Sequence, residues 1–426
     1  MPPKKKYYII TLGCPKNDVE SDAIRKQLFG RLIETEKIAI ADYIIVNTCA
    51  FIQPAINQSD EVIKKILQTK KTKQTVVVTG CYINRNKEML IDKFQDKIII
   101  APLNDIAYHL LSFRNQNENF IYRTNKEKLD YAYIKISDGC NKKCGYCTIP
   151  KIKGRYVSRS IDSILAETEY LLKRKIKELI IVSQDTCYYG KDIKIKYGLI
   201  ELLKKMLEFK FDYRIRLMYL NPDGITKSLI KFISDNEKIC KYIDMPIQHT
   251  ETEILKAMRR PYNKNKIIEL VDFIRKYNPN IALRSAVIVG YPNETQKIFK
   301  RMLETLKILR FDKLGCFKYS DEVDTYSYNL NGKISDALKE KRFDLVMKQQ
   351  QNISRVQNKK YIGTIQKILI DGYDEKNKLY LARNEYNAPE IDGYILFKTK
   401  KNIDLNKFYN IKIIQSFDYD LFGELI

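Results

Sequence analysis

Three short hydrophobic runs open the chain, and a cysteine follows each of them. The runs cover residues 7–11, 43–46 and 75–78, and the cysteines are Cys14, Cys49 and Cys81. The stretches between them, residues 19–28 and 55–68, have the apolar spacing of an amphipathic helix. Strands that alternate with helices predict a parallel α/β sheet, whose strands point their carboxyl ends to one edge. We therefore expect the three thiols to lie together at that edge, where open α/β sheets bind ligands.

A second series of strand-like segments occupies the middle of the chain. Amphipathic helices separate them; the helix expected over residues 161–173, for example, keeps Ile164, Leu165 and Leu172 on one face. Six consecutive β/α units predict a partial (β/α)6 barrel, since full closure takes eight. The strands are expected at residues 133–137, 178–183, 214–220, 242–246, 282–289 and 314–319.

The last part of the chain has the pattern of a small barrel. A polar helix is expected over residues 335–358, and after it short alternating segments are separated by Gly, Asn and Asp turns. This pattern predicts an antiparallel barrel of about five strands, similar to an oligonucleotide-binding module. The 426 residues thus divide into an N-terminal cluster domain (1–122), a partial barrel (123–358) and a small β-barrel (359–426).

The excess positive charge behind the net +24 lies in the first 360 residues. Residues 361–426 contain nine Lys or Arg against ten Asp or Glu, so they are close to neutral and slightly acidic. The excess elsewhere favours a polyanionic partner, although Lys spread along a chain is as typical of a solvated surface. No hydrophobic run approaches the ~20 residues of a membrane span. Because a signal-peptide pattern is also missing, we expect a cytoplasmic protein without a membrane segment.

Cys140, Cys144 and Cys147 form the strongest chemical motif. They follow an expected strand, with spacings of four and three residues. Nine cysteines in a reducing compartment favour metal or redox chemistry over disulfides, and thiolates are the usual ligands of iron-sulfur clusters. Three ligands leave one iron of a cluster open. The alternative is zinc, but a closed zinc site takes four ligands, and the two histidines, His109 and His249, are remote in sequence.

Cys14, Cys49 and Cys81 have two interpretations. Singly, each is well explained as an inert buried thiol. Together, at repeated strand ends, they predict the ligands of a second four-iron four-sulfur cluster, again with one open iron. The cysteines that lack partners at metal spacing are expected to be buried thiols: Cys187, Cys240 and Cys316.

Cys-x-x-x-Cys-x-x-Cys after the first strand of a partial barrel resembles the signature of the radical S-adenosylmethionine (SAM) enzymes. The resemblance implies that the open iron binds the amino and carboxylate groups of SAM, and that an electron from the cluster cleaves SAM to a 5′-deoxyadenosyl radical. It also implies that Tyr146 lies against the adenine, for which simple packing is an equally good explanation. By position alone, Gln184, Arg216 and Ile288 are expected to contact the cofactor or substrate, and no catalytic residue is expected beyond the cluster ligands.

With its second cysteine trio and small C-terminal barrel, the chain resembles the methylthiotransferases over nearly its whole length. The resemblance implies a cluster domain, a radical barrel and a C-terminal TRAM barrel. It also implies that SAM serves once as methyl donor and once as radical source, while the second cluster delivers sulfur. One branch of the family modifies tRNA adenosine (isopentenyladenosine or threonylcarbamoyladenosine). The other adds a methylthio group to the β-carbon of an aspartate in small-subunit ribosomal protein S-twelve.

Local sequence words resemble the ribosomal-protein branch. The tRNA enzymes typically carry Gln-Asn where this chain has Gln-Asp-Thr at residues 184–186. The near-neutral C-terminal barrel favours the same branch, because a barrel that grips tRNA should be basic, whereas basic ribosomal proteins suit a neutral or acidic surface. The other words that resemble this branch lie at residues 12–17, 46–52, 244–249 and 388–393.

Some loop positions depart from the family pattern. Asp324 and Tyr326 stand where Gly and Pro are usual, Asn293 replaces a usual Gly, and Pro261 stands where Gly is common. These departures concern the loops at the mouth of the expected barrel and leave the six predicted cluster ligands unchanged.

We therefore expect an enzyme that holds two four-iron four-sulfur clusters and SAM and modifies ribosomal protein S-twelve in or near the ribosome. A monomer that takes electrons from a flavodoxin or ferredoxin is expected. The tRNA-modifying branch is the nearest alternative. A non-catalytic iron-sulfur protein that binds RNA or the ribosome is the alternative from another class.

Overall fold

The computed structural model describes residues 4–112, 130–405 and 407–426. The chain forms two compact units. The first unit comprises Met1–Lys126, Tyr133–Lys142 and Cys147–Glu167, and the second comprises Glu127–Ala132, Lys143–Tyr146 and Thr168–Ile426. The predicted boundary between residues 122 and 123 lies outside the described residues, and the one between residues 358 and 359 stays a prediction.

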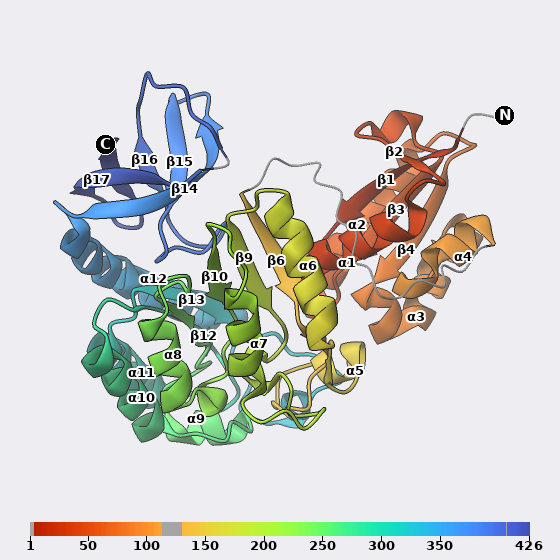
Figure 1. The fold of residues 1–426 in the computed structure, drawn as a ribbon. Coiled ribbons are helices and arrows are strands. Elements are labelled where there is room, and N and C mark those ends of the chain that lie inside the picture. Colours follow the sequence, from red (N-terminus) through yellow and green to blue (C-terminus); the bar gives the residue numbers. More distant parts are fainter. Residues whose placement is uncertain (1–3, 113–129, 406) are drawn as a thin grey trace. The chain divides into compact units, whose positions relative to one another are not determined.

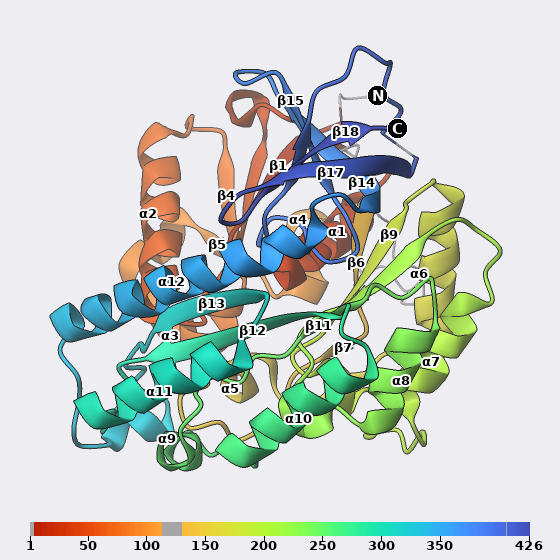
Figure 2. The same cartoon turned by 90° about the vertical axis from the view of Figure 1, so that its left-hand side faces the viewer.

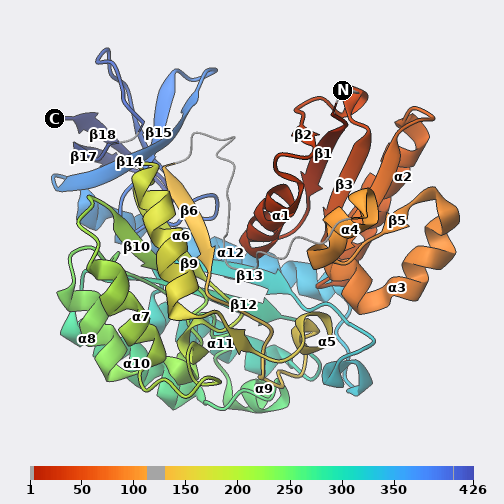
Figure 3. The ribbon, with the colours of Figure 1, turned by 45° about the vertical axis from the view of Figure 1, so that its right-hand side comes forward.

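The first unit contains the predicted parallel sheet, in the strand order β2-β1-β3-β4-β5 (Figure 3). Every pair in it is parallel, which confirms the fold expected from the alternating runs. The sheet is formed by β1 (Lys6–Thr11), β2 (Ile33–Glu34), β3 (Tyr43–Thr48), β4 (Thr75–Gly80) and β5 (Ile99–Ile100). Its helices are α1 (Pro15–Leu28), α2 (Gln53–Thr69), α3 (Cys81–Phe94) and α4 (Ile106–Leu111).

Strand β3 divides the hydrophobic core of this sheet between its two faces. Ile44 and Val46 pack with residues of α2 and α3, whereas Tyr43 and Ile45 pack with residues of α1 and α4. Alternate residues of a strand point to opposite faces, so a strand that is buried on both sides is continuously apolar. The run at residues 43–46 has this composition because helices cover both of its faces.

Six strands in the middle of the chain correspond to the six predicted β/α units (Figure 1). They form two three-stranded sheets, in the orders β10-β9-β6 and β11-β12-β13. The strands are β6 (Tyr131–Lys135), β9 (Glu178–Val182), β10 (Arg214–Leu217), β11 (Tyr242–Asp244), β12 (Ala282–Val289) and β13 (Lys313–Lys318). A parallel bridge between Ile215 and Ile239 continues the pairing beyond β10.

Helices follow these strands as the periodicity predicts. They are α6 (Ile161–Lys173), α7 (Gly198–Leu207), α8 (Lys227–Asp235), α9 (Thr252–Ala257), α10 (Lys264–Tyr277) and α11 (Gln296–Leu309). The loop after β6 also forms β7 (Ser137–Asp138), α5 (Ile149–Lys153) and β8 (Val157–Ser158). None of the described helices is both long and apolar enough to span a membrane.

The C-terminal residues form a closed barrel in the order β14-β15-β16-β18-β17 (Figure 2). Helix α12 (Asp336–Asn358) precedes it. Five strands confirm the predicted size, but the pair β16 and β18 is parallel where an antiparallel barrel was expected. The reason is that a closed ring of five strands cannot alternate direction at every pair: the other four pairs are antiparallel, so the fifth must be parallel. The strands are β14 (Ile365–Asp374), β15 (Leu379–Arg383), β16 (Ile395–Phe397), β17 (Tyr409–Ser416) and β18 (Leu421–Leu425).

Candidate iron-sulfur and cofactor sites

Cys14, Cys49 and Cys81 lie at one edge of the parallel sheet of the first unit. Cys14 follows β1 and Cys49 follows β3, while Cys81 is the first residue of α3, directly after β4. Because β3 pairs with both β1 and β4, the structure brings together the three strand ends that carry the predicted ligands of the second cluster.

Gly13 allows the loops of Cys14 and Cys49 to approach each other. Its φ of +105° lies in the left-handed region that favours glycine. A Cβ atom on Gly13 would lie 2.7 Å from Cβ and 3.0 Å from Sγ of Cys49. Contacts this short are too close for real side chains, so the missing side chain of Gly13 provides the space that the Cys49 thiol occupies.

Buried asparagines fix the same two loops. Nδ2 of Asn17 donates to the carbonyl of Thr48 at 3.2 Å, and Nδ2 of Asn47 donates to the carbonyl of Asn17 at 2.9 Å. Both residues lie inside the sequence words around Cys14 and Cys49, but the sequence assigned them no role. One Asn lies three residues after Cys14 and the other lies two residues before Cys49. This spacing was the signal in the sequence that could have identified them.

The three thiols of this edge influence one another electrostatically. Burial raises the pKa of Cys49, and the negative charge of Cys14 adds to the effect. Burial raises the pKa of Cys81 to about 11; Lys153 opposes the rise, while Glu20, Cys49 and Cys14 add to it. A coordinating metal deprotonates thiols outright. The donor set, three soft sulfur ligands at one sheet edge, fits an iron-sulfur cluster.

The first half of the central cysteine loop is fixed in the first unit. The Cys140 amide donates to the carbonyl of Gly154 at 3.1 Å, and the Cys140 Sγ accepts from the amide of Lys142 at 3.4 Å. Oδ1 of Asn141 accepts from the amide of Tyr156 at 3.0 Å. Backbone donors that point at sulfur are a common feature of cluster-binding loops, because they stabilise charge on the ligand.

The second half of this loop is fixed in the second unit. The Gly145 amide donates to the carbonyl of Met258 at 2.9 Å, and the Gly145 carbonyl accepts from the amide of Ser327 at 2.8 Å. The thiol of Cys144 accepts a hydrogen bond from Nη1 of Arg260 at 3.1 Å. Sequence reasoning missed Arg260, although it lies inside the Met-Arg-Arg-Pro word at residues 258–261.

No three His, Cys, Asp or Glu side chains among the described residues are arranged around a single metal ion. The ligands of a cubane lie further apart, each on its own iron.

Three family models match successive parts of the chain. Residues 6–101 match the Uncharacterized protein family UPF0004, residues 134–306 match the Radical SAM superfamily, and residues 362–426 match the TRAM domain. Two relatives named ribosomal protein uS12 methylthiotransferase RimO match nearly the whole chain. The one from Clostridium botulinum is 37% identical over 99% of this chain and 98% of its own length. The one from Carboxydothermus hydrogenoformans is 38% identical over 99% of this chain and 99% of its own length.

The chain belongs to the uS12 methylthiotransferase family. It is a radical SAM enzyme, and membership of this superfamily implies an iron-sulfur cluster and SAM. A solved structure supports the fold alone: the radical SAM methyltransferase TsrM from Kitasatospora setae has a TM-score of 0.52 at 12% identity, with coverage of 74% of this chain and 72% of that chain.

In this methylthiotransferase, two of the residues predicted to contact the cofactor share one apolar cluster. Tyr146 and Ile288 are both partly buried against Ile254, Met258 and Tyr291. Gln184 follows β9 and is also partly buried. These three residues come from the cluster loop and from the carboxyl ends of two barrel strands, the side on which partial barrels of this type place their chemistry.

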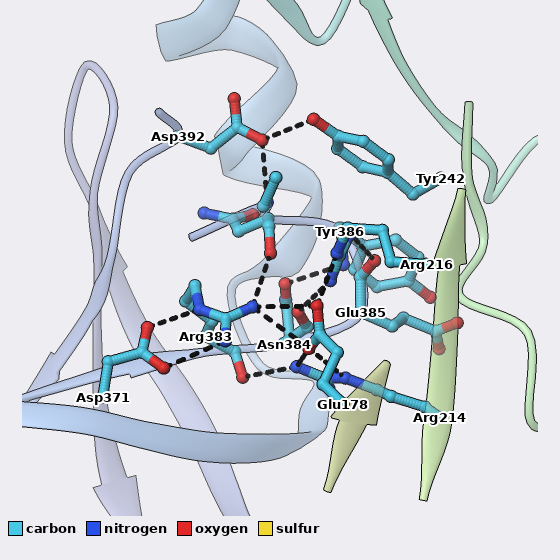
Figure 4. A network of polar contacts seen from close by, with 12 residues as sticks. Glu178, Arg214, Arg216, Tyr242, Asp371, Arg383, Asn384, Glu385, Tyr386 and Asp392 are labelled. Carbon is cyan, nitrogen blue, oxygen red and sulfur yellow. Dashed lines mark hydrogen bonds and ion pairs between the residues drawn. The ribbon is translucent and has the colours of Figure 1, made fainter. Parts of the chain in front are cut away.

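Arg216 lies elsewhere, in a network that joins the radical barrel to the TRAM barrel (Figure 4). Its side chain is fully buried. Nε donates to Oε1 of Glu178 at 2.7 Å, and the guanidinium also donates to the carbonyls of Asn384 and Glu385 at 3.3 and 2.9 Å. These contacts give Arg216 a structural role, and the cofactor contact expected for it stays a prediction.

Two of the departures from the family pattern, Asn293 and Tyr326, fit their surroundings. Asn293 has a φ of +65°, a left-handed conformation that Asn tolerates better than other non-glycine residues. The guanidinium of Arg259 lies 3.6 Å from the centroid of the Tyr326 ring, a cation–π contact that the usual proline would not make. The three remaining cysteines are buried, as predicted: Cys187, Cys240 and Cys316.

Proposed function

We propose that this chain adds a methylthio group to the β-carbon of an aspartate in ribosomal protein uS12. The observation that carries the proposal is the agreement over 99% of the chain with relatives named uS12 methylthiotransferases. The sequence words around the cysteines and the near-neutral C-terminal barrel support the same substrate over tRNA. A near-neutral barrel repels a basic ribosomal protein less than a basic barrel would. RNA binding, in contrast, depends on many contacts between Lys or Arg side chains and phosphates.

Two four-iron four-sulfur clusters are part of the proposal. Cys140, Cys144 and Cys147 would hold the radical cluster, and the trio at the sheet edge of the first unit, Cys14, Cys49 and Cys81, would hold the second. When bound, the radical cluster and SAM supply a carbon radical able to abstract hydrogen from an unactivated C–H bond. Tyr146, Gln184, Arg216 and Ile288 would contact SAM or the substrate.

The proposal also covers localisation, oligomeric state, electron donor and domain limits. The chain would act as a cytoplasmic monomer in or near the ribosome, because uS12 is found there, and a flavodoxin or ferredoxin would supply electrons. We propose the domain limits 1–122, 123–358 and 359–426 for this enzyme. Each of the three family models matches within one of these proposed domains, at residues 6–101, 134–306 and 362–426, which supports the order of the domains.

A deletion strain tests the proposed function. Mass spectrometry should find uS12 without its methylthio group, while methylthio-adenosine in tRNA remains at its normal level. The wild-type chain should restore the modification of uS12, and variants with Cys144→Ala or Cys14→Ala should not. Loss of methylthio-adenosine from tRNA with uS12 unaffected would overturn the proposal. Unchanged uS12 and tRNA would also overturn it and favour a non-catalytic protein.

A further inference from the structure

Arg260 is a buried arginine whose guanidinium lies against the thiol of Cys144. Its Nη1 is 3.1 Å from Sγ of Cys144, and the residue is only 8% exposed. Arg260 lies in the loop between α9 and α10, and both residues belong to the second unit. An arginine stays charged at any pH a protein tolerates, so this loop carries a permanent positive charge next to a predicted cluster ligand.

Two other groups hold the guanidinium in place. Nε donates to the hydroxyl of Tyr262 at 2.7 Å, and Nη2 donates to Oδ1 of Asn221 at 2.5 Å. The hydroxyl of Tyr262 in turn donates to the carbonyl of Ile247 at 3.2 Å. Because the guanidinium is a rigid, planar fork, fixing two of its corners also fixes the direction of the third, which points at Cys144.

The backbone next to Cys144 is fixed independently of Arg260. Gly145 is hydrogen-bonded through its amide to Met258 and through its carbonyl to Ser327. A Cβ atom on Gly145 would lie 3.1 Å from both the carbonyl of Ala257 and the hydroxyl of Tyr291, so the surroundings are tight. The loop therefore has anchors besides Arg260, and the contact of Arg260 with sulfur has a further consequence.

We propose that Arg260 is a positioning residue that raises the reduction potential of the radical cluster through its hydrogen bond to Cys144. The proposal rests on the assignment of Cys144 as a ligand of that cluster. Reduction adds negative charge to a cluster and its sulfur ligands, and hydrogen bonds to those sulfurs are one of the factors that set its potential. A charged donor is stronger than a neutral one, and burial limits screening by salt.

The test measures the midpoint potential of the radical cluster by electron paramagnetic resonance during a redox titration. The full chain carries Cys14→Ala, Cys49→Ala and Cys81→Ala, so that one cluster gives the signal. Arg260→Gln should move the midpoint to a more negative value, by about tenfold or more in the equilibrium for reduction, which is ~59 mV for one electron. Arg260→Lys should shift it less, because the charge remains while the fork is lost.

Lys256→Gln is the matched control. Lys256 is exposed on α9, four residues before Arg260, so its replacement removes the same charge without touching Cys144, and the midpoint should stay unchanged. If Arg260→Gln keeps its iron and sulfide but also keeps the wild-type midpoint, the proposal is overturned. A shift of equal size in Lys256→Gln would overturn it as well, because general charge would then be the cause.

Two milder variants test the proposal if Arg260→Gln cannot hold a cluster. Asn221→Ala and Tyr262→Phe keep the arginine but free one corner of the fork, and each should lower the midpoint by a smaller amount. Wild-type midpoints in both would overturn the proposal. The potential is measured without substrate, so the two claims fail separately: a shifted midpoint in a chain that never modifies uS12 removes the proposed function alone.

Discussion

Arg383 of the TRAM barrel donates two hydrogen bonds to the carboxylate of Glu178, at 3.1 and 3.0 Å, across 205 positions of sequence. Arg214 and Arg216 donate to the same carboxylate at 2.6 and 2.7 Å. Glu178 opens strand β9, and its side chain is fully buried. Glu178 thus pairs with three guanidinium groups where the radical barrel meets the TRAM barrel, and Asp371 forms a second ion pair with Arg383 (Figure 4).

Glu178→Gln should destabilise the second unit by about 3–5 kcal/mol, because removing one partner of a buried ion pair leaves the others uncompensated. Chemical denaturation followed by circular dichroism measures the loss. Glu169→Gln on α6 is the control, since its pair with Lys173 is exposed and such pairs contribute about 0–1 kcal/mol. Equal losses in the two variants would contradict the role given to Glu178.

The Glu178 carboxylate should also make the folding stability of the chain sensitive to acid. Burial alone would raise the pKa of Glu178, but the charges of Arg214, Arg216 and Arg383 hold it well below its usual range. A depressed pKa stabilises the fold above the unfolded value, which is about 4.3 for Glu, and the contribution is lost as the pH falls below it. The wild type should therefore lose stability below about pH 4 more steeply than Glu178→Gln in denaturation curves across pH 3–7. Parallel pH profiles would contradict this.

Asp130 should affect the pH dependence of folding stability in the opposite direction to Glu178. Burial raises the pKa of Asp130 to about 7, with the charge of Asp371 adding to the effect, and its carboxyl oxygens have no hydrogen-bond partner among the residues that the structure describes. A raised carboxyl pKa costs stability as the pH increases from the unfolded value through the folded one. Asp130→Asn should raise the denaturation midpoint at pH 8 and leave it unchanged near pH 3. A variant less stable than the wild type at pH 8 would show that the charge is compensated.

Gly13→Ala should impair the second cluster and spare the radical cluster. The new Cβ atom would collide with Cys49 in a left-handed backbone. The matched control is Gly30→Ala, which has a φ of +75° and no atom near the added Cβ, so it carries only the backbone cost of about 1–2 kcal/mol. Anaerobic iron analysis should find about half the wild-type iron in Gly13→Ala and full iron in Gly30→Ala, if each cubane holds four irons. Full iron in both variants would contradict the close approach of Gly13 to Cys49.

The sequence predicted the parts of the fold that depend on local pattern. The convergence of Cys14, Cys49 and Cys81 on one edge could be predicted, because parallel strands align their carboxyl ends. Arg216 could not be understood in this way. It stands near a strand end, as a cofactor ligand would, but its guanidinium pairs with Glu178 of the neighbouring strand and with the carbonyl of Asn384, which the docking of a distant barrel brings close. Arg260 was missed for the same reason, since its contact with Cys144 spans 116 positions.

Iron and labile sulfide per chain, counted on protein purified without oxygen, test the central claim most directly. The account predicts about eight of each, because two cysteine trios would each hold a four-iron cluster. Cys14→Ala should lower both counts to about four while SAM is still cleaved to 5′-deoxyadenosine. A wild-type count of about four, or zinc in place of iron, would contradict the account.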